Sequence, residues 1–335
     1  MKSSPVHPSV FRRWSLPLLC AVQSCERFAF LAMLPLFVPY AQERHALPAP
    51  TALMVLAVLQ ALSYLGGLPG GWVADNRLGA RLATMLGALL LALSYGALAL
   101  NRASVFWSAL GLMVIGHSLF RPGLHVLIAR ATGHDEQARE RGFLWHYLAA
   151  NIGYAAGALF GEWAHAAVGW TTLFGGAAVA SLLSAGLLML GLSRLENDGT
   201  DVVTTPAQTA APSRHGNMAA VWLLCSVAVV FWLTAQQAGS SLAVFAAVNT
   251  EPQIALLSHA LPLGPGLFAS LHGLMVIAML PIFLYLHGRS QSRAGSTAGK
   301  LVWGYVATAS AFALMAAASL RGGDAGRVSS AWLIG

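Results

Sequence analysis

The sequence predicts an all-α membrane protein, a bundle of apolar helices that cross a lipid bilayer. Hydrophobic residues make up 57% of the 335-residue chain and charged residues only 9%, whereas a soluble domain carries about 25% charge. The apolar runs are long and continuous, while a transmembrane barrel would show short alternating segments. The net charge of +7 comes from basic residues between these runs, a pattern that suits topology control and requires no nucleic-acid partner.

A spanning helix needs about 20 apolar residues, and runs of that kind follow one another along the whole chain. We expect helices at 15–41, 51–74, 80–100, 104–130, 142–166, 169–192, 218–246, 265–287 and 301–320. A further run begins at Ala331 and stops at Gly335, where the sequence ends. The first run extends past signal-peptide length without a convincing cleavage site, so it is interpreted as a retained helix.

Lysine and arginine orient the bundle, because cytoplasmic loops of membrane proteins are enriched in both. With the N-terminus inside, 13 of them face the cytoplasm and 4 face outward. The inside set is Lys2, Arg12, Arg13, Arg77, Arg81, Arg130, Arg139, Arg141, Arg194, Arg214, Arg289, Arg293 and Lys300. The sequence therefore predicts a multi-pass protein whose N-terminus is cytoplasmic.

The one obvious linker, 194–217, is rich in Thr, Ala, Pro and charge and has no apolar face. It divides a six-helix N-terminal bundle, 1–193, from an incomplete C-terminal bundle, 218–335, that has three helices and the start of a fourth. Six helices, a cytoplasmic linker and more helices is the layout of a transporter with two six-helix halves.

The first helix carries an intramembrane acid and base side by side. Gln23, Glu26, Arg27, Phe30 and Leu34 share one face by their spacing. Such a face must point into protein or water, because a charge at the bilayer centre costs about 2.5–3.5 kcal/mol. The pair either pins helix packing or serves function, and intramembrane ionisable groups favour function.

Arg121 is the other basic residue deep in a span, near the middle of 104–130 and just before Pro122 and Gly123. It is either a snorkelling side chain or one that needs a buried acidic partner. Among the first four helices the deep acid is Glu26, so we expect Glu26, Arg27 and Arg121 to form one network.

No metal or cofactor site is indicated by the cysteines and histidines. The three cysteines fall inside predicted spans without a CxxC motif, and no histidine has a second ligand at metal spacing. We interpret His117, His125, His146 and His272 first as packing or polar-network residues, with a proton relay as the alternative.

Two further patterns have a structural and a functional interpretation. Glycines repeat at four-residue spacing at 66–71 and 153–161, which lets helices approach closely. Asp75, Arg77 and Arg81 lie at the cytoplasmic end of 51–74. They are ordinary loop charges or a gate whose ion pairs form in one conformation and break in another.

Ordered motifs along almost the whole chain resemble the proton-dependent oligopeptide transporter family of the major facilitator superfamily. The resembling segments are QSCERF, GGWVADNRLGAR, GHSLFRPG, GFLWHYLAANIG, GWTTLFG, FWLTAQQAGSSLAVFA and PGLFASLHGLMVIAMLPIF. The resemblance implies a major-facilitator helical bundle that takes up di- and tripeptides with protons by alternating access. It also adds Tyr147, Asn151, Gln236 and His272 to the candidate substrate or coupling residues.

The departures from the family pattern concern charge. The family's first helix 1 glutamate is Gln23 here, its helix 7 glutamate is Gln236, and its helix 1 arginine is Leu34. That arginine and the helix 7 glutamate pair in the family, so their joint loss leaves no uncompensated buried charge. The helix 4 lysine is Arg121, and Phe30 stands where a tyrosine is expected.

The resulting prediction is a bacterial inner-membrane transporter of small solutes, with peptides the first expectation. The alternative is a non-transporting, degenerate or truncated membrane interaction protein; nothing in the sequence indicates an enzyme. Glu26 should stay ionised between two arginines, so we expect transport down the solute gradient with weak pH dependence. Protons as coupling ions, the substrate and the completeness of the chain stay open at this point, because helices 10–12 of the family have no counterpart here.

The predicted orientation can be tested with a cysteine at Gly199 in the cytoplasmic linker. A membrane-impermeant maleimide should not label Gly199→Cys in intact cells, because the linker faces inward. Thr250→Cys, in the expected outside loop, is the matched control and should be labelled. Strong labelling of Gly199→Cys in sealed cells would overturn the orientation.

Overall fold

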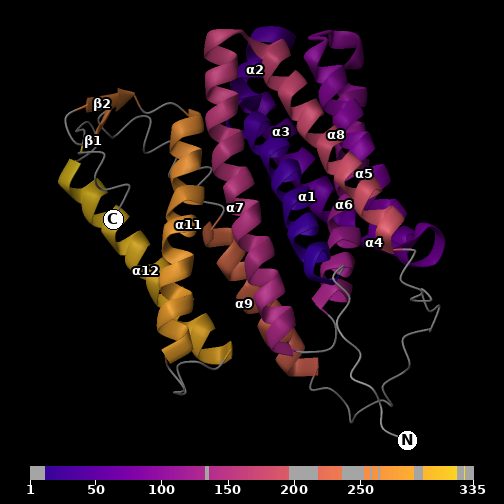
Figure 1. Ribbon diagram of the computed structural model, residues 1–335. Coiled ribbons are helices and arrows are strands. Elements are labelled where there is room, and N and C mark those ends of the chain that lie inside the picture. Colours follow the sequence, from indigo (N-terminus) through magenta and orange to yellow (C-terminus); the bar gives the residue numbers. More distant parts are fainter. Residues whose placement is uncertain are drawn as a thin grey trace, which may run out of the picture. The chain divides into compact units, whose positions relative to one another are not determined.

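The computed structural model describes residues 12–132, 136–195, 218–235, 253–256, 259–262, 265–289, 297–322 and 328. Long helices account for most of them (Figure 1). The described elements form two compact units, one of residues up to Gly199 with Pro265–Leu280, the other of Thr200–Gly264 with Pro281–Gly335. The expected all-α class is confirmed, with one short hairpin as an addition.

Helices of the first unit cover six of the expected spans. They are α1 (Arg12–Met33), α2 (Phe37–His45), α3 (Ala49–Leu65), α4 (Gly67–Val73), α5 (Gly79–Ala99), α6 (Ala103–Thr132), α7 (Glu136–Ala167) and α8 (Trp170–Leu195). Two short turns, η1 (Leu34–Leu36) and η2 (Ala74–Leu78), lie between them. The start of α11 (Pro265–Arg289) also belongs to this unit.

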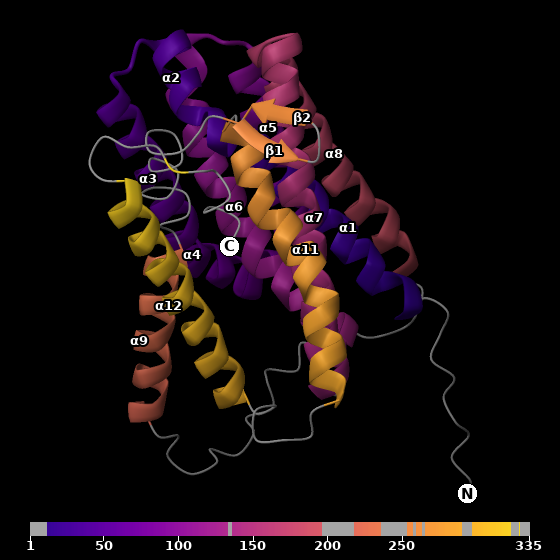
Figure 2. The same ribbon diagram turned by 90° about the vertical axis from the view of Figure 1, so that its left-hand side faces the viewer.

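The second unit contains α9 (Met218–Ala235), α12 (Thr297–Gly322) and the continuation of α11 from Pro281. The strands β1 (Gln253–Leu256) and β2 (His259–Pro262) form an antiparallel hairpin just before α11 (Figure 2). This hairpin lies in the segment that we expected as an outside loop. The last part of the expected span 218–246, beyond Ala235, lies outside the described residues.

Two expected spans are interrupted, and each break has a sequence cause. The span 15–41 ends as α1 at Met33, and the chain turns through η1 before α2. Pro35 has no backbone N–H to continue the helical hydrogen bonds. The span 51–74 is divided at Gly66 into α3 and α4, where the missing side chain lowers helical preference.

Five described helical stretches are long and apolar enough to cross a membrane: Ser15–His45, Ala49–Ala99, Ala103–Thr132, Trp170–Gly191 and Val302–Gly322. Large apolar side chains on the outer faces remain exposed, among them Leu68, Leu190 and Trp222. A bilayer accepts such side chains, because lipid tails are as apolar as they are.

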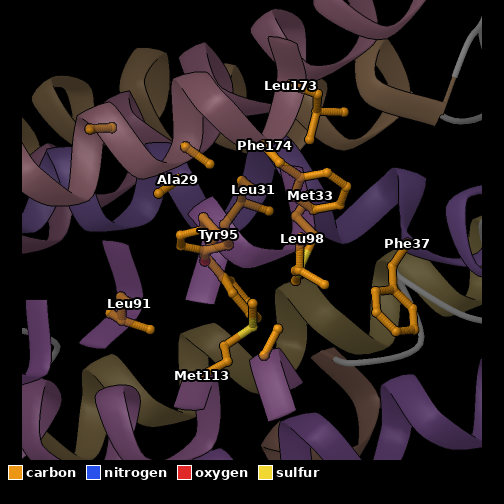
Figure 3. Packing of buried hydrophobic residues seen from close by; sticks show 14 of the residues in the cluster. Ala29, Leu31, Met33, Phe37, Leu91, Tyr95, Leu98, Met113, Leu173 and Phe174 are labelled. Atoms are coloured by element: carbon orange, nitrogen blue, oxygen red, sulfur yellow. The ribbon is translucent and has the colours of Figure 1, made fainter. Parts of the chain in front are cut away.

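The core of the first unit lies between α1, α5, α6 and α8 (Figure 3). Tyr95 lies among Leu31 and Met113, and all three are almost fully buried. Nearer α2, the ring of Tyr40 packs edge-on against Phe174 with ring centroids 4.5 Å apart. This packing holds α1 and α5 in place around the charged residues of α1.

Glycines set how closely α7 approaches α1. A Cβ added at Gly153, Gly157 or Gly161 would collide with the backbone carbonyl of Ser24, Phe28 or Ala32, respectively. The two four-residue series therefore lie directly against each other, one helical turn at a time. This is the close packing expected from the small-residue spacing.

Replacing Gly157 by alanine tests this contact. Because the added methyl group meets rigid backbone, we expect Gly157→Ala to destabilise the protein by about 1–3 kcal/mol. The control is Gly175→Ala on α8, where an added Cβ meets nothing and helix propensity improves slightly. Thermal unfolding followed by tryptophan fluorescence would reveal the difference; equal stability of the two variants would contradict the close approach.

Candidate functional site

The site begins with an ion pair between sequence neighbours on α1. Glu26 is 2% exposed, and its carboxylate accepts two hydrogen bonds from Arg27, Nε to Oε2 at 2.6 Å and Nη2 to Oε1 at 3.0 Å. Adjacent residues on a helix normally diverge, so the arginine side chain has to turn back over the glutamate. This bidentate geometry compensates the desolvation that a single buried charge would suffer.

The helix α6 supplies two more polar groups to this pair. His117 is fully buried, and its Nδ1 lies 3.1 Å from Oε1 of Glu26. The imidazole also meets the ring of Phe30 edge-on, with centroids 5.1 Å apart. One turn further along α6, the Arg121 guanidinium lies 5.6 Å from the same phenyl ring and 4.7 Å from the ring of Tyr64.

Phe30 is the shared contact of the two arginines. The guanidinium of Arg27 also lies 5.6 Å from its ring centroid. A ring face attracts a cation by its quadrupole, so Phe30 makes a favourable contact with both guanidinium groups. A tyrosine at this position would have added a hydroxyl group; the phenylalanine makes the contact purely apolar and cation–π.

Several buried polar atoms of the site have no hydrogen-bond partner within the described part of the chain. They are Nε and Nη1 of Arg121, both ring nitrogens of His117 and the hydroxyl oxygen of Tyr95. Buried polar groups are nearly always satisfied in proteins. A buried cluster with unsatisfied donors and an excess of one positive charge, from Glu26, Arg27 and Arg121, is therefore suited to an anionic ligand.

The other helix 1 candidates line the same stretch of α1. Gln23 is 8% exposed and lies one turn before the ion pair, while Leu34 is half-buried at the start of η1. The uncharged side chain of Leu34 packs against the apolar core.

The remaining candidate substrate or coupling residues that the structure describes lie on α7 and α11, far from the ion pair in the sequence. Asn151 is buried, and its amide donates a 2.9 Å hydrogen bond to the backbone oxygen of Tyr147. The ring of Tyr147 is about half exposed. His272 on α11 lies 5.6 Å from the ring of Tyr154. Gln236 lies outside the described residues.

The candidate gate occupies the turn after α4. Asp75 and Arg77 are exposed within η2, and Arg81 is half-buried in the first turn of α5. Gly79, between them, has a φ of 76°, a conformation that glycine adopts without strain. Their gating role stays a prediction.

Three members of the site were not assigned to it from the sequence. Tyr64 and Tyr95 gave no sequence signal, since aromatic residues are common in spans. His117 did carry one, because it precedes Arg121 by one helical turn and so shares its face. No group of three or more metal-ligating side chains lies together in the described ranges.

Comparison with known proteins gives a consistent picture. The family model of the Major Facilitator Superfamily matches residues 19–335. Dipeptide and tripeptide permease A of Proteus mirabilis is 23% identical over 95% of this chain and 74% of its own length. Peptide transporter YePEPT of Yersinia enterocolitica is 26% identical over 78% of this chain but only 49% of its own length.

Solved structures share the fold. Tetrameric PepTSo2 superimposes with a TM-score of 0.77 at 21% identity, covering 97% of this chain and 80% of the other. A POT family transporter in complex with 5-aminolevulinic acid gives a TM-score of 0.73 at 20% identity, with 95% and 79% covered. These matches are to transporters and not to enzymes, as the sequence predicted.

The ion pair and the free guanidinium should respond differently to neutralisation. Glu26→Gln leaves Arg27 and Arg121 buried without an anion, so we expect a loss of about 3–5 kcal/mol in stability. Arg121→Met removes a cation without a carboxylate hydrogen bond and should change stability by about 1 kcal/mol or less. Melting temperatures in one detergent would compare them, and an unchanged melting temperature for Glu26→Gln would contradict the dependence of the fold on this pair.

Proposed function

The chain belongs to the Major Facilitator Superfamily, as a divergent member of its oligopeptide transporter family, and from that premise we propose that it carries small peptide-like solutes across a membrane by alternating access. The superfamily consists of multi-pass membrane transporters. The curated relatives reported above are bacterial, and the lysine and arginine count favours a cytoplasmic N-terminus. The bacterial inner membrane is therefore the proposed location.

The observation that supports the proposal most directly is that Arg121 has buried donors without an acceptor. Its guanidinium lies over two aromatic rings, and two of its nitrogens are buried without an acceptor in the described part of the chain. A carboxylate fits a guanidinium by two parallel hydrogen bonds. The free carboxylate of a peptide would satisfy these donors and neutralise the excess positive charge of the site.

The aromatic and apolar surroundings limit the solute further. Phe30 and Tyr64 flank the guanidinium, and Leu34 takes a place where the family has an arginine. The proposed pocket therefore has one cation for the carboxylate and an apolar wall beside it. Short peptides with apolar side chains suit this arrangement better than charged ones.

The remaining candidate residues have supporting roles in the proposal. Gln23, Asn151, Tyr147, Gln236 and His272 would contribute polar contacts on the solute's path. The charges of the gate, Asp75, Arg77 and Arg81, would pair when the cytoplasmic side is closed and separate when it opens.

The alternative of a non-transporting interaction protein is not favoured. The matched relatives are transporters, and the match to the superfamily model extends from residue 19 to residue 335.

Counterflow in liposomes tests the proposal without any assumption about energy coupling. Vesicles that contain the purified protein and are preloaded with unlabelled L-alanyl-L-alanine should transiently accumulate the labelled dipeptide. Arg121→Met should reduce affinity about tenfold or more, because a charge-assisted hydrogen bond is worth about 1.5–3 kcal/mol. L-alanyl-L-alanine amide, which has no carboxylate, should compete poorly.

The matched control is Arg130→Met on the same helix, where the side chain is exposed. It should exchange dialanine like the parent. Absence of counterflow in the parent, or equal counterflow in Arg121→Met, would contradict the proposal.

A further inference from the structure

His117 is the buried base closest to the centre of the site. Its Nδ1 lies 3.1 Å from a carboxylate oxygen of Glu26, but neither ring nitrogen has a hydrogen bond of good geometry with the described residues. The ring is fully buried and contacts Phe30 by its edge. An imidazole so placed is poorly satisfied when neutral and would gain an ion pair with Glu26 when protonated.

Close helix packing keeps His117 beside the carboxylate. A Cβ added at Gly116 would lie 2.9 Å from Cγ of Leu91, and one added at Gly87 would lie 2.8 Å from the carbonyl oxygen of Gly116. With α5 and α6 this close, α6 cannot move further toward α5 without a clash. His117 therefore cannot leave Glu26 by a shift of its helix in that direction.

The charges around His117 decide when it can accept a proton. The facing titratable and charged groups are Glu26 and Arg27 on α1, Arg121 on α6, Tyr95 on α5 and, beyond Arg121, Tyr64 on α3. Among these charged groups, the two arginines exceed the one glutamate by one positive charge. A further proton would raise the excess to two in a poorly screened interior, which is unfavourable.

A bound carboxylate removes that obstacle. When a solute carboxylate lies on Arg121 and the ammonium group of the solute lies outside the site, the charges of the site sum to zero. One added proton then restores only the charge that the empty site already carries. We infer that His117 binds the proton that enters with a solute carboxylate, taking it from water when the carboxylate docks on Arg121 and releasing it to water when the solute leaves. The proton joins the free lone pair of the imidazole, and no other bond forms or breaks.

Other groups in the described site are worse acceptors. Glu26 would have to give up its bidentate hydrogen bonds from Arg27, and Gln23 is an amide. His125 and His146 form a separate pair, with ring centroids 5.4 Å apart, and His125 lies two helical turns from His117 along α6. We expected weak pH dependence because two glutamates of the family are missing here and Glu26 stays ionised. A histidine can bind the proton in their place.

The inference rests on the proposed function, since it needs a carboxylate on Arg121. Binding linkage then requires that solute and proton favour each other equally. Affinity for dialanine should rise as pH falls, by up to about tenfold per pH unit where His117 titrates.

Calorimetry measures this proton uptake directly. Dialanine is titrated into the purified protein at one pH in two buffers of different ionisation enthalpy, phosphate and Tris. The difference in heat should correspond to an uptake of about one proton per bound dipeptide in the parent. His117→Asn, which retains a donor near the position of Nδ1 but cannot be protonated, should bind dialanine with no proton uptake.

His125→Asn is the matched control on the same face of α6 and should take up the proton like the parent. If His117→Asn does not fold, His117→Gln and the measurement on the parent still decide. Dialanine binding without proton uptake in the parent, or unchanged uptake in a His117 variant, would overturn this inference and leave the proposed function intact. Failure of the parent to bind dialanine would overturn both.

Discussion

The pairing of Glu26 with Arg27 is the interaction on which the site depends. A lone carboxylate in a spanning helix would be too costly, and the two hydrogen bonds from its neighbour make it tolerable. Within the described part of the chain, no hydrogen bond joins Arg121 to this carboxylate, and the Arg121 guanidinium packs on the rings of Phe30 and Tyr64. In the proposed function, the ion pair on α1 thus leaves on α6 a cation whose donors a solute carboxylate can use.

Glycine contacts determine how closely the helices around this site approach each other. Where glycine faces a backbone carbonyl, as at Gly157 on α7 and Gly87 on α5, two helices meet at a separation that no larger residue allows. Such contacts act in lipid, where apolar burial alone does not draw helices together. These contacts hold α7 against α1, which carries Glu26, and α5 against α6, which carries His117. Residues without a functional group thereby help to position both members of the 3.1 Å contact between His117 and Glu26.

The sequence predicted the order of the helices in the first unit and the buried charges, because apolar length and intramembrane charge are local signals. It did not predict the breaks at Met33 and Gly66, since hydropathy continues through both. It also did not place His117 against Glu26. That contact depends on how α1 and α6 are rotated about their axes, which a single sequence does not specify. The same holds for Tyr64, whose ring centroid lies 4.7 Å from the Arg121 guanidinium.

The four-residue series of glycines on α7 has a mechanical meaning. Gly153, Gly157 and Gly161 meet three successive turns of α1, so the two helices can neither slide nor roll past each other without a clash. The two helices therefore behave as one rigid pair, which keeps Glu26 on α1 and Asn151 on α7 at a constant separation. Any rearrangement that opens one side of the membrane must then bend or tilt other helices. Glu26, Arg27 and Phe30 would then keep their arrangement on α1 while other helices move, so the part of the proposed site that α1 carries would be the same on both sides of the membrane.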